Sequence, residues 1–111
     1  MRIIYAAMDV LAIASRAEGM PISAIEAMAS GVAVVSTAVG GVPDLLCGKG
    51  FLVPENCPQE FALRLEEAMD GSERVDRIRY FARNYVREHH DLAAMGISLD
   101  RLYRSLLETC P

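Results

Sequence analysis

The chain contains two short apolar runs that are separated by about one helix length. "VLAIA" at 10–14 and "VAVVS" at 32–36 are continuous and rich in small or β-branched residues, which is typical of strands buried on both faces. The segment between them, "PISAIEAMAS" at 21–30, is followed by Gly31, a residue suited to a helix C-terminus. This spacing predicts a βαβ unit, and therefore a parallel sheet with a right-handed crossover.

The rest of the chain predicts one more strand and three helices. The third strand is "GFLVP" at 50–54, and the helices are expected at 58–69, 73–89 and 92–108. Each helix carries an apolar stripe, which we interpret as a core or docking face. The stripes consist of Phe61, Leu65 and Met69 in the first helix, Val75, Ile78, Ala82, Tyr85 and Val86 in the second, and Met95, Leu99, Leu102 and Leu106 in the third.

The predicted fold class is α/β, with half of a Rossmann-like parallel sheet and a helical C-terminal tail. A chain of 111 residues has room for one domain, but three strands fall short of the five or six of a complete nucleotide-binding sheet. We therefore expect a single partial domain over 1–111, with a βαβ core at 1–57 and a helical part at 58–111. The strand at 10–14 would have one bare edge, which predicts pairing with another segment or with a second copy of the chain.

Composition excludes several classes of protein. A net charge of −4 and a pI near 5.1 argue against nucleic-acid binding through a basic face. Three cysteines without a C-x-x-C pair indicate a reducing, cytoplasmic setting. No apolar window approaches the ~20 residues of a transmembrane segment, and His89 and His90 lack the neighbouring ligands that a metal site would need.

The turn "SRAEGM" between the first strand and the first helix is the candidate ligand site. Ligands of open α/β sheets bind at the carboxyl ends of strands, and a helix N-terminus suits a phosphate group. Gly19 would let the backbone approach such a ligand closely. Glu18 can accept hydrogen bonds from hydroxyls above that N-terminus, and Glu26 can bind a ribose diol with both oxygens.

Both glutamates also fit a structural interpretation. Ser15-x-x-Glu18 and Ser23-x-x-Glu26 match the capping box, in which the glutamate only satisfies a backbone donor. Pro21 favours a helix that starts before Ser23. From the residues alone, both interpretations stay open.

A longer stretch resembles a known family. "EGMPISAIEAMASGVAVVSTAVGGVPDLL" is similar to the signature of retaining, nucleotide-sugar-dependent glycosyltransferases of the GT-B architecture, the glycosyl transferases of group 1. The flanking "YAAMDVLAIAS" resembles the family's preceding helix end and strand. "GFLVPENCPQEFALRLEEAMD" resembles its following segment, and "LYRSLL" its last helix, so the similarity covers nearly the whole chain.

This resemblance implies roles for particular residues. Glu18 is the candidate catalytic residue, facing the donor sugar's hydroxyls, and Glu26 would hold the nucleotide ribose. Gly40 and Gly41 match a glycine pair that serves either as a turn or as a ligand contact. The backbone that meets the sugar and phosphates corresponds to Gly19, Met20, Pro21 and Ile22.

The resemblance also implies what this stretch lacks. The family's donor site takes an Arg and a Lys from an upstream segment, and its acceptor site comes from a preceding domain; neither has a counterpart here. We therefore expect a fragment of a hexosyl- or pentosyltransferase that is inactive alone. It would bind a nucleotide-sugar donor only when an upstream segment completes it, with no cofactor and no metal. The rival interpretations are a non-catalytic interaction module that pairs through its open sheet edge, or a fragment of a GT-B type nucleotide-sugar epimerase or phosphorylase.

Overall fold

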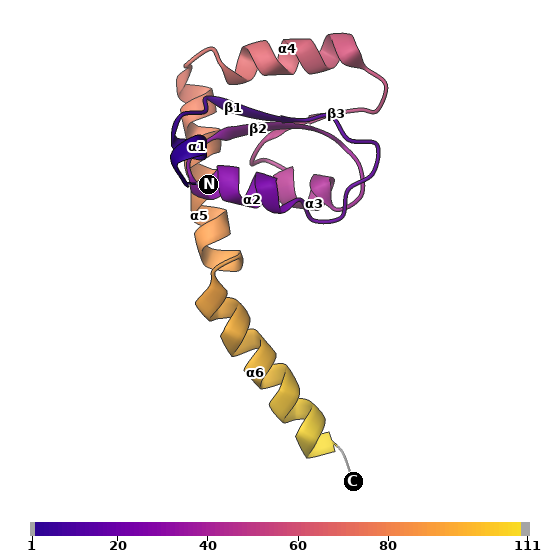
Figure 1. Cartoon of the computed structure of the whole chain (residues 1–111), viewed down its shortest axis with the longest axis vertical. Helices are drawn as coiled ribbons and strands as arrows, with labels where there is room; N and C mark the ends of the chain where they lie inside the picture. The colour runs from indigo at the N-terminus through magenta and orange to yellow at the C-terminus, as the bar shows by residue number, and fades with distance from the viewer. Residues whose placement is uncertain (1, 110–111) are drawn as a thin grey trace.

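The computed structural model describes residues 2–109 and contains one three-stranded parallel sheet (Figure 1). Strands β1 (Val10–Ile13), β2 (Ala33–Thr37) and β3 (Phe51–Val53) lie in the order β1-β2-β3. Val10 pairs with Ala33, and Val35 pairs with Phe51. The βαβ prediction and the parallel sheet are confirmed, with boundaries within one residue of those expected.

Helices cover both faces of this sheet. On one face lie α2 (Ile22–Ala29) and α3 (Val42–Leu46), and on the other lies α4 (Pro58–Ala68) (Figure 1). Helix α5 (Glu73–His89) runs beside the layers and contributes to both cores: Val75 is buried on the α4 side, whereas Ala82 and Val86 are buried on the α2 side. β2 therefore has buried residues on both faces, as its continuous apolar sequence predicts.

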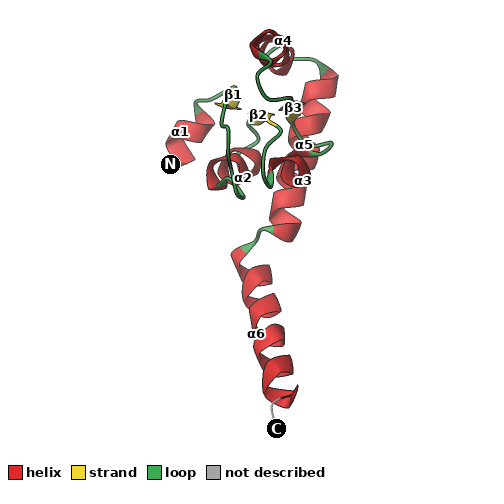
Figure 2. Cartoon of the chain, turned by 90° about the vertical axis from the view of Figure 1, so that its right-hand side faces the viewer, coloured by secondary structure: helices red, strands yellow, loops and turns green. Residues whose placement is uncertain are grey.

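Two short helices were not predicted from periodicity. Helix α1 (Arg2–Ala6) precedes β1, and α3 follows the glycine pair. Each has only five residues, so neither repeats an apolar position often enough to produce a helical pattern. Figure 2 shows α1 on the β1 side of the sheet. Within residues 2–109, no strand pairs with the outer edge of β1.

Helix α6 (Leu92–Thr109) extends away from the body of the molecule (Figure 1). Its predicted stripe is not part of a core in this structure, because Met95 is 54% exposed and Leu102 is 52% exposed. Met69 at the end of α4 is also exposed, whereas Phe61 and Leu65 pack against the sheet as predicted. Because the α6 stripe is exposed, it is not a core face, and of the two interpretations offered above only a docking face remains.

Candidate functional site

The loop after β1 holds Glu18 at the carboxyl end of the sheet. The Ser15 hydroxyl donates a hydrogen bond to Glu18 Oε1 at 2.7 Å. The Ser15 carbonyl accepts one from Thr37 Oγ1 at 2.5 Å, which ties this loop to the end of β2. Glu18 is therefore half-buried and fixed by its own loop, with room for a further hydrogen-bond donor on its carboxylate.

Helix α2 begins without a side-chain cap. Pro21 is the N-cap residue, with φ −71° and ψ 113°, and no cap side chain accepts a hydrogen bond from the first turn. The amides of Ile22 and Ser23 precede the first intrahelical donors, since the Ala24 amide is the first to reach the Pro21 carbonyl. Such amides, together with the helix dipole, suit a bound anion.

The capping-box interpretation of Ser23 and Glu26 is wrong. Ser23 lies inside α2 rather than at its N-cap, so it cannot serve as the first residue of such a box. Ser15 does contact Glu18, but through the two side chains, and both residues lie in the loop before α2 rather than at the N-cap and third position of a helix. Pro21 is a residue typical of the first helical position, and in this structure it is the N-cap residue, one position earlier.

The glycine pair packs directly against the loop that carries Glu18. The Gly41 amide donates to the Gly19 carbonyl at 3.1 Å. A Cβ on Gly40 would lie 1.6 Å from the Glu18 carbonyl oxygen, and Gly40 also has a φ of +55°. The fold itself therefore requires glycine at position 40. Of the two roles considered for the glycine pair, this observation supports the turn.

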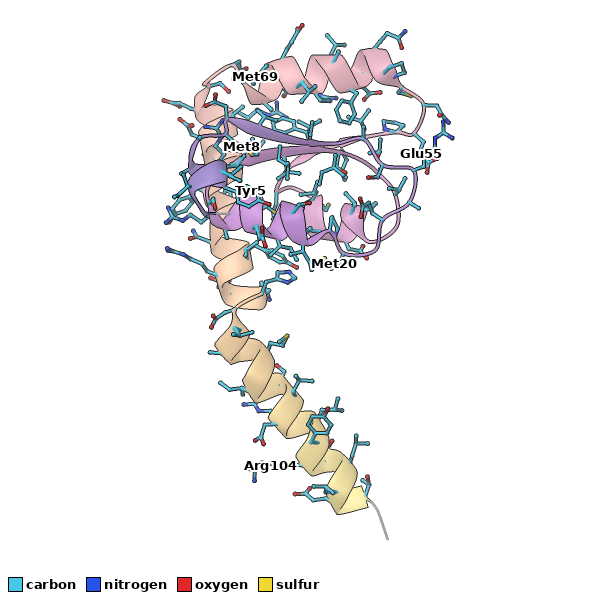
Figure 3. The ribbon with its side chains drawn as sticks, in the orientation of Figure 1. Tyr5, Met8, Met20, Glu55, Met69 and Arg104 are labelled. Atoms are coloured by element: carbon cyan, nitrogen blue, oxygen red, sulfur yellow. The ribbon has the colours of Figure 1, made fainter. Side chains whose placement is uncertain are left out.

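Gly19 differs from Gly40 in this respect. A Cβ on Gly19 would meet nothing within 4 Å, and its φ is not in the left-handed region. The neighbouring Met20 side chain is 49% exposed and that of Ile22 is 70% exposed. Figure 3 shows Met20 on the outside of the molecule. The Gly19 carbonyl is bound by the Gly41 amide, but the side of its Cα where a side chain would lie faces open space, two residues before the uncapped N-cap of α2.

Glu26 lies one turn further along α2, on the helix against which Tyr5 of α1 packs. Tyr5 is 4% exposed and belongs to the same core cluster as Ala27 and Met28 of α2. Burial raises the pKa of the Tyr5 phenol, and the Glu26 carboxylate raises it further. Sequence reasoning did not single out Tyr5; an aromatic residue with a polar tip in "YAAMDV" was the available signal.

The predicted residues thus form one continuous surface rather than a closed pocket. Glu18 and Gly19 through Ile22 are adjacent on one loop, and the glycine pair packs beneath them. Glu26 follows Ile22 by four positions, which corresponds to about 6 Å along the helix axis. This arrangement fits an elongated ligand with its anionic part at the start of α2 and another polar group near Glu26.

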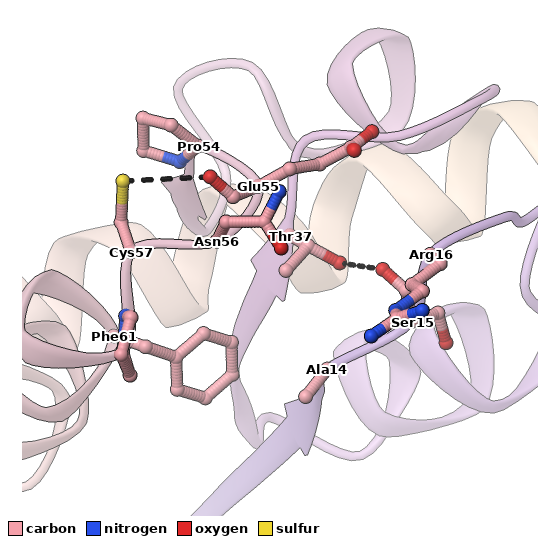
Figure 4. Close-up of a pocket in the computed structure, with 10 residues that line it drawn as sticks. Ala14, Ser15, Arg16, Thr37, Pro54, Glu55, Asn56, Cys57 and Phe61 are labelled. Atoms are coloured by element: carbon pink, nitrogen blue, oxygen red, sulfur yellow. Dashed lines mark hydrogen bonds between the residues drawn. The ribbon is translucent and has the colours of Figure 1, made fainter.

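A cavity of about 520 Å³ lies on the α4 side of the same sheet edge (Figure 4). Arg16, Thr37, Asn56 and Phe61 are among the residues that line it. Lys49 is engaged elsewhere, with its Nζ 4.1 Å from the centre of the Tyr85 ring. Lys49 thus contacts groups outside the loop that carries Glu18, whereas Arg16 is exposed and lines the cavity.

Two features are absent from residues 2–109. The side chains there include no group of three or more His, Cys, Asp or Glu residues arranged to hold a metal ion. None of the described helices is long and apolar enough to cross a membrane.

Comparisons with known proteins identify the family. Residues 1–85 match the family described as glycosyl transferases group 1. A putative colanic acid biosynthesis glycosyltransferase of Salmonella typhimurium is 54% identical over 52 residues, which are 45% of this chain and 13% of that protein.

Solved structures share the fold over almost the whole chain. Sucrose-phosphate synthase from Thermosynechococcus elongatus superimposes with a TM-score of 0.88 at 26% identity, covering 97% of this chain and 28% of that one. Anabaena HepE, solved in complex with UDP-glucose, gives 0.84 at 25% identity, covering 92% of this chain and 29% of that one. This chain spans less than a third of each of these relatives. It belongs to the glycosyl transferases group 1 family and corresponds to a C-terminal part with the Rossmann-like fold of GT-B proteins.

Proposed function

We propose that this chain forms the C-terminal half of the donor-binding domain of a retaining glycosyltransferase, which transfers a sugar from a nucleoside diphosphate-sugar. The observation that carries the proposal is the uncapped start of α2, which follows Glu18 and Gly19 in the chain and lies next to open space at the Gly19 Cα. The similarity to HepE, which was solved with UDP-glucose, supports this substrate class.

Each part of the surface would bind one part of the donor. The amides at the start of α2 would accept the phosphate groups, and Glu18 would bind hydroxyls of the sugar close to the reacting carbon. Glu26 would bind the two ribose hydroxyls through its carboxylate. In the transfer, the bond from the sugar carbon to the phosphate oxygen would break and release the nucleoside diphosphate. A bond to the acceptor oxygen would form on the same face, and the proton of the acceptor hydroxyl would pass to the leaving diphosphate.

Charge balance explains why this half would be inactive alone. The diphosphate is anionic, and Glu18 and Glu26 add negative charge next to it. The start of α2 supplies only partial positive charge, equivalent to roughly half an elementary charge. We therefore propose that further cationic side chains, from a segment outside these residues, are needed for tight binding and for the reaction.

Calorimetric titration with UDP tests this proposal. The chain should bind UDP weakly, and more tightly when an upstream half of a related donor domain is supplied. Glu26→Ala should weaken binding in both settings, because the ribose loses its carboxylate. Glu66→Ala, which removes an exposed carboxylate from α4, is the matched control. Unchanged binding by Glu26→Ala would rule out the ribose assignment.

A further inference from the structure

The cavity beside α4 lies at the edge where all three strands end. Its walls include Ala14 and Arg16 after β1, Thr37 at the end of β2, and Asn56 after β3. Phe61 of α4 forms a further wall (Figure 4). Ligands of open parallel sheets bind at this edge, and a volume of about 520 Å³ suits a small organic molecule.

Asn56 is a wall residue with an unusual backbone conformation. Its φ is +58°, and it is the one non-glycine residue of the described chain in this left-handed region. Glycine adopts that conformation without steric cost, and asparagine is among the few other residues that tolerate it. Asparagine at this position therefore keeps the turn and adds an amide, with donors and an acceptor, to the cavity wall.

The polar side chains of the wall differ in how much of their hydrogen-bonding capacity is used. The Ser15 and Thr37 hydroxyls donate hydrogen bonds within the protein. Arg16, Glu55 and Asn56 are exposed, and their side chains make no hydrogen bond or ion pair within residues 2–109. A ligand in the cavity would therefore meet three planar groups with unused donors and acceptors.

The charges of the wall cancel. Arg16 and Glu55 carry one charge of each sign, and no other described side chain of the lining is charged, so an anion or a cation would gain little net attraction. The Phe61 ring and two prolines supply apolar surface. A neutral ring sugar matches this combination, because its C–H groups pack on an aromatic face and its hydroxyls pair with planar polar groups.

Ser15 connects this cavity to the proposed donor site. Its side chain lines the cavity and donates a hydrogen bond to Glu18 Oε1 at 2.7 Å. One residue thus separates the cavity from the carboxylate that would bind the donor sugar. A reaction between two bound sugars requires that the reacting atoms are held close together.

We propose that this cavity is a subsite for the acceptor, a neutral ring sugar whose hydroxyl receives the transferred sugar. The inference rests on the function proposed above. The family resemblance predicts an acceptor site in a preceding domain, and in this proposal the present chain adds a wall to that site. The acceptor oxygen would bond to the donor sugar carbon as the bond from that carbon to the phosphate oxygen breaks, and the hydroxyl proton would leave with the nucleoside diphosphate.

The test titrates the whole ¹⁵N-labelled chain with methyl β-D-glucopyranoside and, separately, with inorganic phosphate. Asn56→Gly removes the amide but keeps the left-handed turn, because glycine adopts it freely. Arg16→Ala removes the guanidinium, and Arg101→Ala, at an exposed position of α6, is its matched control. Circular dichroism checks that each variant is folded.

The sugar should shift the Phe61 amide of the parent, whereas phosphate should not. Asn56→Gly and Arg16→Ala should each raise the dissociation constant for the sugar by about three- to tenfold, which is the range expected for one net hydrogen bond. Arg101→Ala should bind the sugar as the parent does.

A second measurement tests whether the cavity lies next to the donor. With UDP-glucose and the methyl glucoside both present, interligand NOEs should connect the methyl group of the glucoside to the glucose ring of UDP-glucose. This measurement uses the parent chain, so it decides the point even if a variant fails to fold.

Each alternative outcome decides a different point. If UDP shifts the amides from Gly19 to Ile22 but the sugar shifts none in the cavity, the acceptor subsite is overturned and the proposed function stands. The same holds if all three variants bind the sugar equally, if phosphate binds in the cavity, or if both ligands bind without interligand NOEs. If the parent binds no UDP, the proposed function fails, and the acceptor role of the cavity fails with it.

Discussion

Two glycines at the site have opposite environments. Gly40 has a left-handed φ of +55° and lies against the Glu18 backbone, whereas Gly19 faces open space with an ordinary φ. Gly40→Ala should therefore lower the free energy of unfolding by at least about 2 kcal/mol, from backbone strain and a clash. Gly19→Ala should change it by no more than about 0.5 kcal/mol. Urea unfolding measures both, and equal losses would contradict this distinction.

Gly19→Ala also separates an effect on ligand binding from an effect on stability. Because the Gly19 backbone is proposed to approach the donor, Gly19→Ala should weaken UDP binding although its stability is unchanged. A calorimetric titration of this variant checks the expectation. UDP binding equal to that of the parent would mean that the open space at Gly19 is not used by the ligand.

The buried Tyr5 phenol makes stability depend on alkaline pH. Its pKa in the folded chain is above 10.0, the value taken for an unperturbed tyrosine, so the folded state retains this proton longer than the unfolded state. The stabilisation is fully present below pH 10 and is lost as the pH rises through the folded pKa. Urea unfolding between neutral pH and pH ~11 should show this decrease. Tyr5→Phe should show a smaller one, and an identical pH profile would contradict the assignment.

At the scale of single elements, the starts of α2 and α5 contrast. Ser72 Oγ caps α5 by accepting from the Val75 amide at 3.3 Å, whereas Ser23 lies within α2. Ser72→Ala should therefore destabilise the chain by about 1 kcal/mol. Ser23→Ala should change stability by less than about 0.5 kcal/mol, since alanine is the better helix former. A loss for Ser23→Ala as large as that for Ser72→Ala would contradict the cap assignment.

Sequence patterns predicted the elements whose burial repeats regularly along the chain. β2 is buried on both faces, so its unbroken apolar sequence was sufficient, and α5 shows a buried stripe of Val75, Ala82 and Val86. α1 and α3 were missed because five residues carry no measurable period. The stripe of α6 is present but exposed, because periodicity identifies an apolar face and not what covers it.

The candidate site was predictable to a similar, partial extent. A glutamate before a helix start at the end of a buried strand can be read from spacing, and the structure places Glu18 there. The packing of Tyr5 with Ala27 and Met28 joins residues far apart in sequence, so no local pattern reports it. Likewise, "GG" indicates a turn, but its packing against the Glu18 loop is a tertiary contact between segments distant in sequence, which the local sequence does not report.

At the scale of the whole molecule, two surfaces within residues 2–109 could bind a second chain. No strand pairs with the outer edge of β1, and the apolar stripe of α6 is exposed. An open edge with few charges promotes strand pairing between copies. We predict that the chain self-associates in sedimentation velocity experiments. Ala12→Lys, which places a charge on the exposed side of β1, should shift the population toward monomer.

The control for this prediction is Ala62→Lys, the same change at an exposed position of α4. It adds one charge without touching β1, so it should leave the sedimentation profile unchanged. A monomeric parent at high concentration, or equal effects of the two lysines, would show that the β1 edge does not drive association.

We propose that half of a nucleotide-sugar donor site extends from Glu18, in the loop after β1, to Glu26 in α2. The most direct test of this proposal is an amide NMR titration of the uniformly ¹⁵N-labelled chain with millimolar UDP. We predict progressive shifts of the Gly19, Met20 and Ile22 amides that end near Glu26. No shifts at all, or shifts confined to Asn56 and Phe61 in the cavity beside α4, would contradict it.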